Sequence, residues 1–234
     1  MKTIGLLGGM SWESTALYYQ QLNKIIQQRL GGLHSAKIIL NSVNFAEIEY
    51  LQQQGDWAQA AQILQHEARK LQDAKVDGIL LCTNTMHLVA PEIQQAISVP
   101  LLHIADATAK YILKQNIYKV ALLGTAFTME QDFYKDRLMA HGLEILIPSA
   151  QARAYIHHTI YNELCVGKIK ESSKQAFLNI IEDLKQQGAQ GIILGCTEIV
   201  MLLPEQNACN LPLFDTTLIH VKEAAEFMLS EASF

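Results

Sequence analysis

Short apolar runs alternate along the chain with longer segments in which apolar residues recur every three or four positions. The runs are typical of strands buried on both faces, and the longer segments are typical of amphipathic helices. Predicted strands cover residues 4–7, 37–40, 99–102, 119–123, 143–147 and 211–214, with two more beginning at residues 78 and 191. Predicted helices cover residues 12–30, 57–74, 91–97, 105–114, 129–141, 151–165, 171–187 and 216–229, while residues 41–55 predict a long loop. This order predicts an α/β fold with parallel sheets, right-handed crossovers and helices on both faces.

Part of the pattern occurs twice. Residues 78–85 read Gly-Ile-Leu-Leu-Cys-Thr-Asn-Thr and align without a gap with residues 191–198, Gly-Ile-Ile-Leu-Gly-Cys-Thr-Glu. Thr83 then lies opposite Cys196. The duplication predicts two similar lobes related by a rough twofold, with these two residues on opposite walls of one cleft. We place the first lobe at residues 1–104 plus 215–234 and the second at residues 105–214.

Composition narrows the class of protein. The chain has 234 residues, half of them hydrophobic, and a net charge of -5 with no basic run, which argues against a nucleic-acid partner. No apolar run is long enough to span a bilayer, so no membrane partner is expected. The four cysteines lack CxxC spacing, which disfavours a disulfide framework or a metal site. A reducing cytoplasm is the expected location.

Polar residues follow the predicted strands at their carboxyl ends, where open α/β sheets bind ligands. They lie at residues 8–11, 41–44, 83–85, 124–128 and 196–198. Hydroxyls, amides and the N–H groups of helix starts suit a carboxylate ligand. The Gly8-Gly9 turn matches neither GxGxxG nor GxxxxGK[ST], so nucleotide binding is not expected.

Cys196 is the best candidate for a reactive group, because a helix start would stabilise its thiolate; the alternative is a buried structural cysteine. Cys82 should point away from Thr83, since side chains alternate along a strand. Glu198 could bind a substrate ammonium, tune Cys196 or complement a helix dipole. His87 could orient the cleft or cap a helix.

Three segments together resemble the aspartate/glutamate racemases of the cofactor-independent Asp/Glu/hydantoin racemase superfamily. They are the opening Ile-Gly-Leu-Leu-Gly-Gly-Met-Ser-Trp-Glu-Ser-Thr and the two strand-end motifs, and the resemblance extends over nearly the whole chain. It implies two flavodoxin-like lobes, a cleft between them, a homodimer, an amino acid substrate and no cofactor. In that family two acid/base residues flank the α-carbon; one removes its proton while the other delivers a proton to the opposite face.

The sequence departs from the family pattern at two places. Most relatives have a cysteine where this chain has Thr83, and a hydroxyl is a far weaker acid than a thiol. Some aspartate racemases bind the substrate carboxylates with an arginine and a lysine. At the aligned positions this chain has Ile48 and Cys165. Gln52 or Lys168 could serve instead, or the substrate range could be broader.

The expected activity is therefore racemisation of aspartate or glutamate without pyridoxal phosphate. The expected catalytic residues are Thr83 and Cys196, and the expected substrate-binding residues are Met10, Ser11, Gln52, Asn84, Thr85, Thr125, Thr197 and Glu198. By resemblance, Cys196 faces the α-proton of the L-enantiomer. The alternatives are a catalytically silent amino-acid-binding protein and a sister enzyme, such as a hydantoin racemase, a maleate isomerase or a decarboxylase of substituted malonates.

Overall fold

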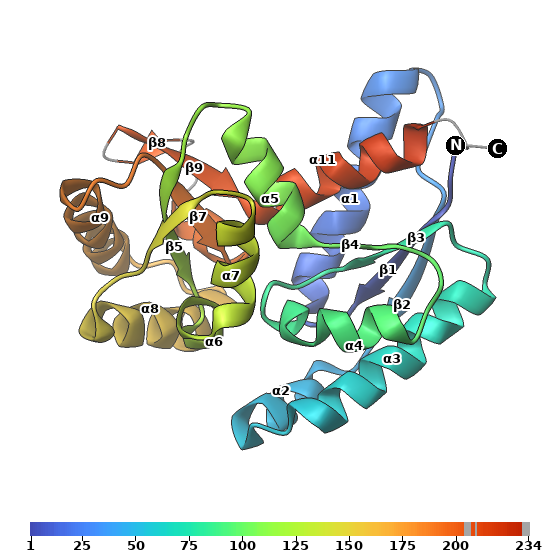
Figure 1. The fold of residues 1–234 in the computed structure, drawn as a ribbon, viewed down its shortest axis with the longest axis horizontal. Helices are drawn as coiled ribbons and strands as arrows, with labels where there is room; N and C mark the ends of the chain where they lie inside the picture. The colour runs from blue at the N-terminus through green and yellow to red at the C-terminus, as the bar shows by residue number, and fades with distance from the viewer. Residues whose placement is uncertain (204–206, 209, 231–234) are drawn as a thin grey trace. The chain divides into compact units, whose positions relative to one another are not determined.

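A computed structural model describes residues 1–203, 207–208 and 210–230 (Figure 1). The chain forms two units, Met1–Ile104 with His220–Phe234 and Ala105–Ile219. Each unit has its own sheet with helices, so the prediction of an α/β fold with two lobes is confirmed. Cys209, one of the four cysteines, lies outside the described residues.

The first unit contains a four-stranded parallel sheet in the order β2-β1-β3-β4. Its strands are β1 Ile4–Gly8, β2 Ile38–Ser42, β3 Gly78–Leu81 and β4 Leu101–Leu102. Its helices are α1 Trp12–Leu30, α2 Phe45–Gln54, α3 Trp57–Asp73, the 3-10 helix η1 Thr85–Val89 and α4 Ala90–Gln95, with most of α11 Thr216–Leu229. β1 and β3 lie next to each other and are wholly buried.

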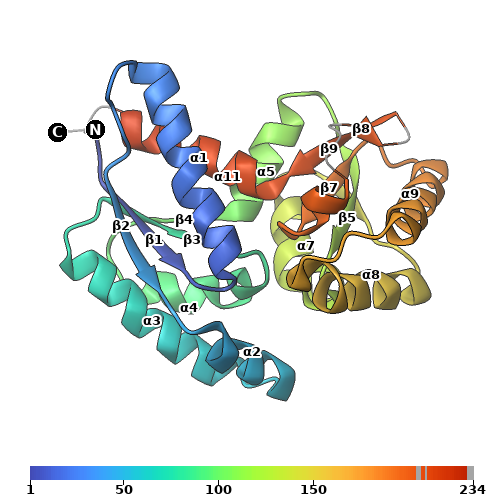
Figure 2. The same cartoon turned by 180° about the vertical axis from the view of Figure 1, so that it is seen from behind.

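Helices cover both faces of this sheet, as expected for strands without exposed positions. Figures 1 and 2 show α1 and α11 on one face and α3 and α4 on the other. An apolar cluster fills each interface. One joins α1 to α11 through Tyr18, Leu22 and Val221, and the other gathers around Leu64 and Ile79.

The second unit contains a five-stranded sheet in the order β6-β5-β7-β9-β8. Its strands are β5 Lys119–Gly124, β6 Glu144–Leu146, β7 Ile192–Gly195, β8 Asn207–Ala208 and β9 Leu211–Asp215. The first four strands of that order run parallel, while β8 pairs antiparallel with β9 and was not predicted. The helices are α5 Ile104–Leu113, α6 Ala126–Glu130, α7 Asp132–Ala140, α8 Ala150–Asn162, η2 Leu164–Val166, α9 Glu171–Gln186 and α10 Ile199–Leu202.

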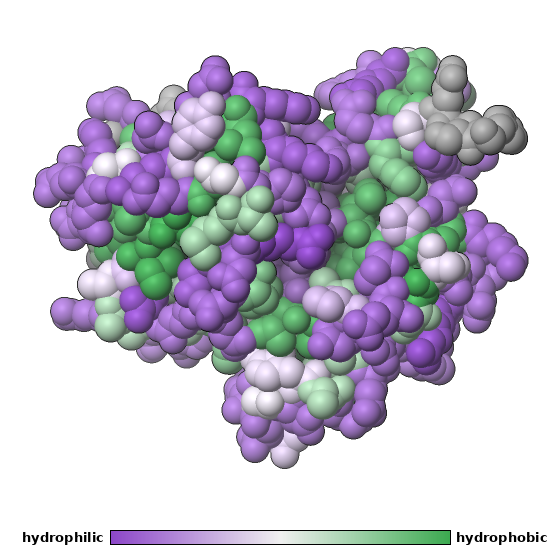
Figure 3. Space-filling view, in the orientation of Figure 1, coloured by the Kyte–Doolittle hydropathy of each residue, from purple (hydrophilic) through white to green (hydrophobic). Residues whose placement is uncertain are grey.

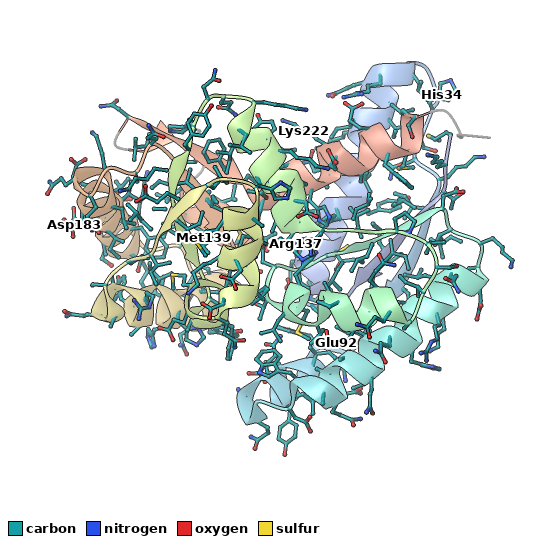
Figure 4. The ribbon with its side chains drawn as sticks, viewed as in Figure 1. His34, Glu92, Arg137, Met139, Asp183 and Lys222 are labelled. Carbon is teal, nitrogen blue, oxygen red and sulfur yellow. The ribbon has the colours of Figure 1, made fainter. Side chains whose placement is uncertain are left out.

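An ion pair fixes the beginning of α5 within this unit. Arg137 of α7, labelled in Figure 4, donates from Nε and Nη2 to the two carboxylate oxygens of Asp106, both at 2.7 Å. Burial alone would raise the pKa of Asp106, but the hydrogen bonds from Arg137 and His141 outweigh it and hold that pKa below its usual value. The ion pair therefore links α5 to α7, which are separated in the sequence by β5 and α6.

Two of the predicted elements were wrong. Residues 41–55 contain α2 instead of a long loop, because Asn44 caps the helix and Ile48 and Gln52 bury one face of it. The predicted helix 129–141 is two helices. The backbone is extended at Gln131 (φ -77°, ψ 152°), and the first helix begins earlier because Thr125 caps it.

The surface shown in Figure 3 is mostly hydrophilic, with apolar residues scattered over it. Such scattered apolar residues are normal on folded proteins. Within the described part of the chain, no helix combines the length and the apolar character that crossing a membrane requires.

Glycine is required at one turn after β1. Gly9 has φ +93°, and a Cβ there would lie 2.2 Å from the carbonyl oxygen of Val43. The Gly9 N–H donates to Thr15 Oγ1 at 2.8 Å, and Ser11 then caps α1 by accepting from the Ser14 N–H. The turn therefore fixes the path of Met10 and Ser11.

His220 is a buried imidazole of α11 in the first unit. Its Nε2 lies 2.7 Å from the Leu102 carbonyl oxygen and its Nδ1 lies 2.9 Å from the Tyr18 hydroxyl. A carbonyl only accepts, so Nε2 carries the hydrogen and Nδ1 accepts from Tyr18. Burial lowers the pKa of His220 to about 4, although the bond to Leu102 opposes the shift.

This shift predicts an acid sensitivity of the fold. In the unfolded chain His220 has a pKa of about 6.5, so it binds a proton below that pH. In the folded protein it stays neutral down to pH about 4. The stabilisation is therefore complete above pH 6.5 and decreases as the pH falls, by a total on the order of 3 kcal/mol. Urea unfolding at pH 7 and 4.5 should show a smaller loss of stability for His220→Gln than for the wild type. Equal losses in the two proteins would contradict the shift.

Candidate active site

The first unit brings several of the candidate residues to one edge of its sheet. Leu7 pairs with Leu81, so the turn after β1 and the segment after β3 leave the sheet side by side. Met10, Asn84 and Thr85 are buried there, whereas Ser11 and Thr83 are half-buried. The Ser14 hydroxyl donates to the Cys82 carbonyl oxygen at 3.4 Å and links the two segments.

Cys82 and Thr83 differ in their surroundings. Cys82 is fully buried in the apolar cluster between the sheet, α1 and α11, and burial raises the pKa of its thiol well above the usual value. Its N–H donates to the Leu7 carbonyl oxygen at 2.9 Å. Thr83 retains an accessible side chain, so of these neighbours only Thr83 is exposed to a ligand at this edge.

Gln52 lies on the buried face of α2 and reaches the same region. Its amide nitrogen donates to the sulfur of Met86 at 2.9 Å, directly after Asn84 and Thr85 in the chain. Ile48, one helical turn earlier, is fully buried in the core. Lys168 and Cys165 are exposed in the second unit.

The second unit repeats the arrangement at the end of β7. Gly124 pairs with Gly195, so Thr125 and Cys196 follow neighbouring strands. Thr125 is buried and caps α6 by accepting from the Thr128 N–H at 3.3 Å. Cys196 is half-buried.

Glu198 is the hydrogen-bond partner of the two residues before it. Its Oε2 accepts from Cys196 Sγ at 2.8 Å and from Thr197 Oγ1 at 2.7 Å. All three side chains are half-buried. The thiol hydrogen therefore points at a carboxylate, which is a base that can receive it.

The prediction that a helix start stabilises the Cys196 thiolate was wrong. The following helix, α10, has four residues and begins only at Ile199. Burial, the charge of Glu198 and the hydrogen bond to Glu198 raise the pKa of Cys196 well above its ordinary value, and Cys165 adds a smaller contribution. Cys196 is a neutral thiol at neutral pH, and it becomes a base only after its proton moves to an acceptor.

A substitution of Glu198 should show this effect directly. Glu198→Gln removes the negative charge beside the sulfur, so the pKa of Cys196 should fall and its thiolate should form at lower pH. We expect the rate of iodoacetamide alkylation, followed on the Cys196 peptide by mass spectrometry, to rise at a lower pH than in the wild type. Glu198→Asp keeps the charge and is the matched control. A profile for Glu198→Gln that is unchanged, or moved to higher pH, would contradict the assigned cause.

A third strand, β9, ends at the same edge; the strand itself was predicted, but the polar residues at its end were not included in the predicted site. Leu194 pairs with Asp215, so the segment after β9 lies beside the segment with Cys196. Thr216 Oγ1 donates to the Leu194 carbonyl oxygen at 2.8 Å, and Asp215 Oδ1 accepts from the N–H groups of Thr217 and Leu218. The Asp-Thr-Thr run at the predicted strand end was the available signal. These residues support the Cys196 segment from its other side.

The described residues contain no group of three or more His, Cys, Asp or Glu side chains arranged to hold a metal ion. The candidate side chains at these sheet edges are hydroxyls, amides, the Cys196 thiol and the carboxylates of Glu198 and Asp215. This set can bind a small zwitterion and move protons.

The sequence matches the family model for Asp/Glu/Hydantoin racemase over residues 7–224. The chain belongs to the Asp/Glu/hydantoin racemase family. The predictions of family and of enzyme class are thereby confirmed, since racemases are isomerases. Both strand-end segments and the glycine turn lie within the matched range or directly at its start.

Individual members of the family agree with this. The broad specificity amino-acid racemase RacX of Bacillus subtilis is 26% identical over an alignment that covers 98% of this chain and all of RacX. A Yersinia pestis protein assigned to the Asp/Glu racemases has a solved structure with 53% identity and a TM-score of 0.93, covering 98% of this chain and all of that one. An aspartate racemase homologue from Pyrococcus horikoshii has 33% identity and a TM-score of 0.86 at the same coverage.

Proposed function

We propose that this family member racemises amino acids without pyridoxal phosphate and acts on aspartate or glutamate. The hydrogen bond from the Cys196 thiol to the Glu198 carboxylate is the observation that carries the proposal. It places a proton acceptor beside the group that must become a thiolate. Thr83 follows β3 at the position that the internal repeat pairs with Cys196, and it is the proposed second acid/base group.

The proposed reaction begins on the L-enantiomer. The Cys196 proton passes to Glu198, and the resulting thiolate removes the α-proton of the substrate. The electron pair left on the α-carbon delocalises into the substrate carboxylate. The Thr83 hydroxyl then donates a proton to the opposite face and becomes an alkoxide. Water returns a proton to that alkoxide, and Glu198 releases to the resulting hydroxide the proton that it took from Cys196, so every group ends in its starting state. General acid/base groups of this kind contribute about 10²–10⁴-fold each.

The proposed binding residues are polar groups at the same strand ends. Met10, Ser11, Asn84 and Thr85 of the first unit, with Thr125 and Thr197 of the second, would hold the α-carboxylate and the ammonium. Gln52 is proposed for the side-chain carboxylate, because it is a buried amide next to the Asn84–Thr85 segment. An exchange of its Met86 contact for a carboxylate would be favourable, since charge-assisted hydrogen bonds are the stronger ones.

The test uses purified protein stripped of pyridoxal phosphate with hydroxylamine and a panel of amino acids, a hydantoin and maleate. Chiral chromatography should show L-aspartate or L-glutamate approaching an equal mixture with its enantiomer. Turnover of only the hydantoin or maleate would overturn the substrate assignment.

Thr83 favours one alternative of a different class, a catalytically silent amino-acid-binding protein. A hydroxyl at that position can hold a ligand but is a poor proton carrier. Calorimetric binding of an amino acid, with no exchange of its α-proton in deuterated water, would establish this alternative. The Cys196–Glu198 pair argues against it, because binding alone does not require a thiol whose proton has an acceptor.

We further propose that the protein is a cytoplasmic homodimer. The dimer is proposed from the resemblance to the family, and the cytoplasm is proposed because the mechanism requires a reduced Cys196. Cys82, Cys165 and Cys196 are free thiols. Light scattering at micromolar concentration should give twice the mass of the 26.2 kDa chain. A monomer mass would contradict the dimer.

A further inference from the structure

His87 is a buried imidazole whose two ring nitrogens both contact the backbone. Its Nδ1 lies 2.7 Å from the Thr83 carbonyl oxygen, and its Nε2 lies 3.3 Å from the backbone nitrogen of Ile104, the first residue of α5. The side chain is 1% exposed. The ring therefore links the segment that carries Thr83 to the start of a helix.

These two partners determine the protonation of the ring. A carbonyl oxygen only accepts, so Nδ1 carries the hydrogen, and a backbone N–H only donates, so Nε2 presents its lone pair. A proton added at Nε2 would face the Ile104 N–H and break that bond. These two contacts therefore define the tautomer of His87, with the hydrogen on Nδ1 and the lone pair on Nε2.

Other rings enclose His87 within the first unit. The His103 ring centroid is 4.5 Å away and the His220 ring centroid is 5.8 Å away, and His220 is itself bonded to Tyr18. His103 is 8% exposed and His220 is fully buried. The packing leaves the ring little freedom, so the position of Nδ1 is fixed by the core.

Among the described residues, the hydrogen bonds of Thr83 are made by its backbone. Its N–H donates to the Leu81 carbonyl oxygen at 2.9 Å, and its own carbonyl oxygen accepts from His87. Both backbone groups are therefore anchored from inside while the side chain stays half-buried. The hydroxyl takes its direction from a peptide unit that His87 fixes.

We infer that His87 is a positioning residue for Thr83. By holding the Thr83 carbonyl group, His87 orients the threonine hydroxyl for delivery of a proton to the substrate. The inference rests on the proposed function. A displacement of about 1 Å of a reacting group can cost on the order of 10²-fold in rate. Loss of the anchor should therefore slow the step that uses Thr83 and leave the step that uses Cys196 almost unchanged.

The experiment measures two rates in deuterated water with L-aspartate or L-glutamate. Loss of the α-proton, followed by NMR, reports the step at Cys196, and formation of the D-enantiomer reports completion by Thr83. Their ratio, exchange divided by inversion, is the readout. A residue that only supports the fold would lower both rates and leave this ratio unchanged.

Two substitutions separate the functions of the two ring nitrogens. Asparagine presents an amide N–H close to the position of Nδ1, so His87→Asn keeps the bond to Thr83 and loses the bond to Ile104. Glutamine presents its amide oxygen close to Nε2, so His87→Gln keeps the bond to Ile104 and loses the bond to Thr83. Each loses one buried hydrogen bond, so their stabilities should be similar.

We expect the ratio to rise about 10-fold or more in His87→Gln, consistent with the cost of misplacement. In His87→Asn it should stay within about threefold of the wild type. An unchanged ratio in His87→Gln, or equal ratios in the Asn and Gln variants, would overturn the inference while leaving the proposed function standing. If His87→Gln does not fold, His87→Asn decides: a wild-type ratio supports the inference and a raised ratio overturns it. A wild type that neither exchanges nor inverts any amino acid would overturn the proposed function, and this inference with it.

Discussion

Cys196→Ser should lower the rate of racemisation by about 10³-fold or more, because it removes an acid/base group of the α-proton transfer. A serine hydroxyl can still donate to Glu198, so the hydrogen bond and the local fold should survive. The hydroxyl is nevertheless too weak an acid to form an effective anion at neutral pH. Exchange of the α-proton of the L-enantiomer should fall with racemisation, since both begin at the same thiolate.

The matched control is Cys165→Ser, which makes the same chemical change at an exposed thiol of the same unit. It should retain most of the activity. Chiral chromatography gives the racemisation rate, and circular dichroism checks the fold of both variants. Wild-type activity in Cys196→Ser would remove this residue from the mechanism.

Thr83→Cys should raise the rate of racemisation by about 10-fold or more, because a thiol is a much better acid and base than a hydroxyl. Enantiomers in achiral water have equal free energy, so kcat/KM must be equal in the two directions under any fixed conditions. A better group on one face lowers the barrier of the shared path, and both directions accelerate together. A one-way enzyme is therefore not expected from the unlike pair.

Thr83→Val is the control for this substitution, since valine has nearly the shape of threonine and lacks the hydroxyl. It should slow inversion, whereas Thr83→Cys should accelerate it. The assays should contain a reductant that keeps the new thiol reduced. If Thr83→Val inverts its substrate as fast as the wild type, another group delivers the second proton.

Much of the fold could be predicted because its strands are buried on both faces. β1 and β3 consist of apolar residues and glycine, and the helix at Trp12–Leu30 has a capping serine before it and an apolar stripe along it. α2 could not be predicted in the same way, because only two of its residues are buried, the apolar Ile48 and the polar Gln52. The weak stripe of α2 resembles a polar loop when only the sequence is read.

The candidate site was predictable as a set of positions but not in its electrostatics. The internal repeat singled out Thr83 and Cys196 because strand ends recur at the same place in each half. The pKa of Cys196 depends instead on the direction of one side chain, Glu198, two residues away. A helix of four residues also gives less stabilisation than the sequence suggested. The support from Asp215 and Thr216 depends on the pairing of β7 with β9, which the sequence does not specify.

The most direct test of the central claim, that an unlike pair of acid/base groups racemises an amino acid without a cofactor, is isotope exchange in deuterated water. Each enantiomer of aspartate or glutamate is incubated with the wild-type protein, and α-deuteration and inversion are followed together. We expect the L-enantiomer to lose its α-proton faster than it inverts, because the Cys196 thiolate can return a deuteron to the same face before Thr83 acts. The D-enantiomer should show little exchange without inversion. Equal rates of exchange and inversion for both enantiomers would contradict the unlike pair, and the absence of both processes would contradict the proposed racemase.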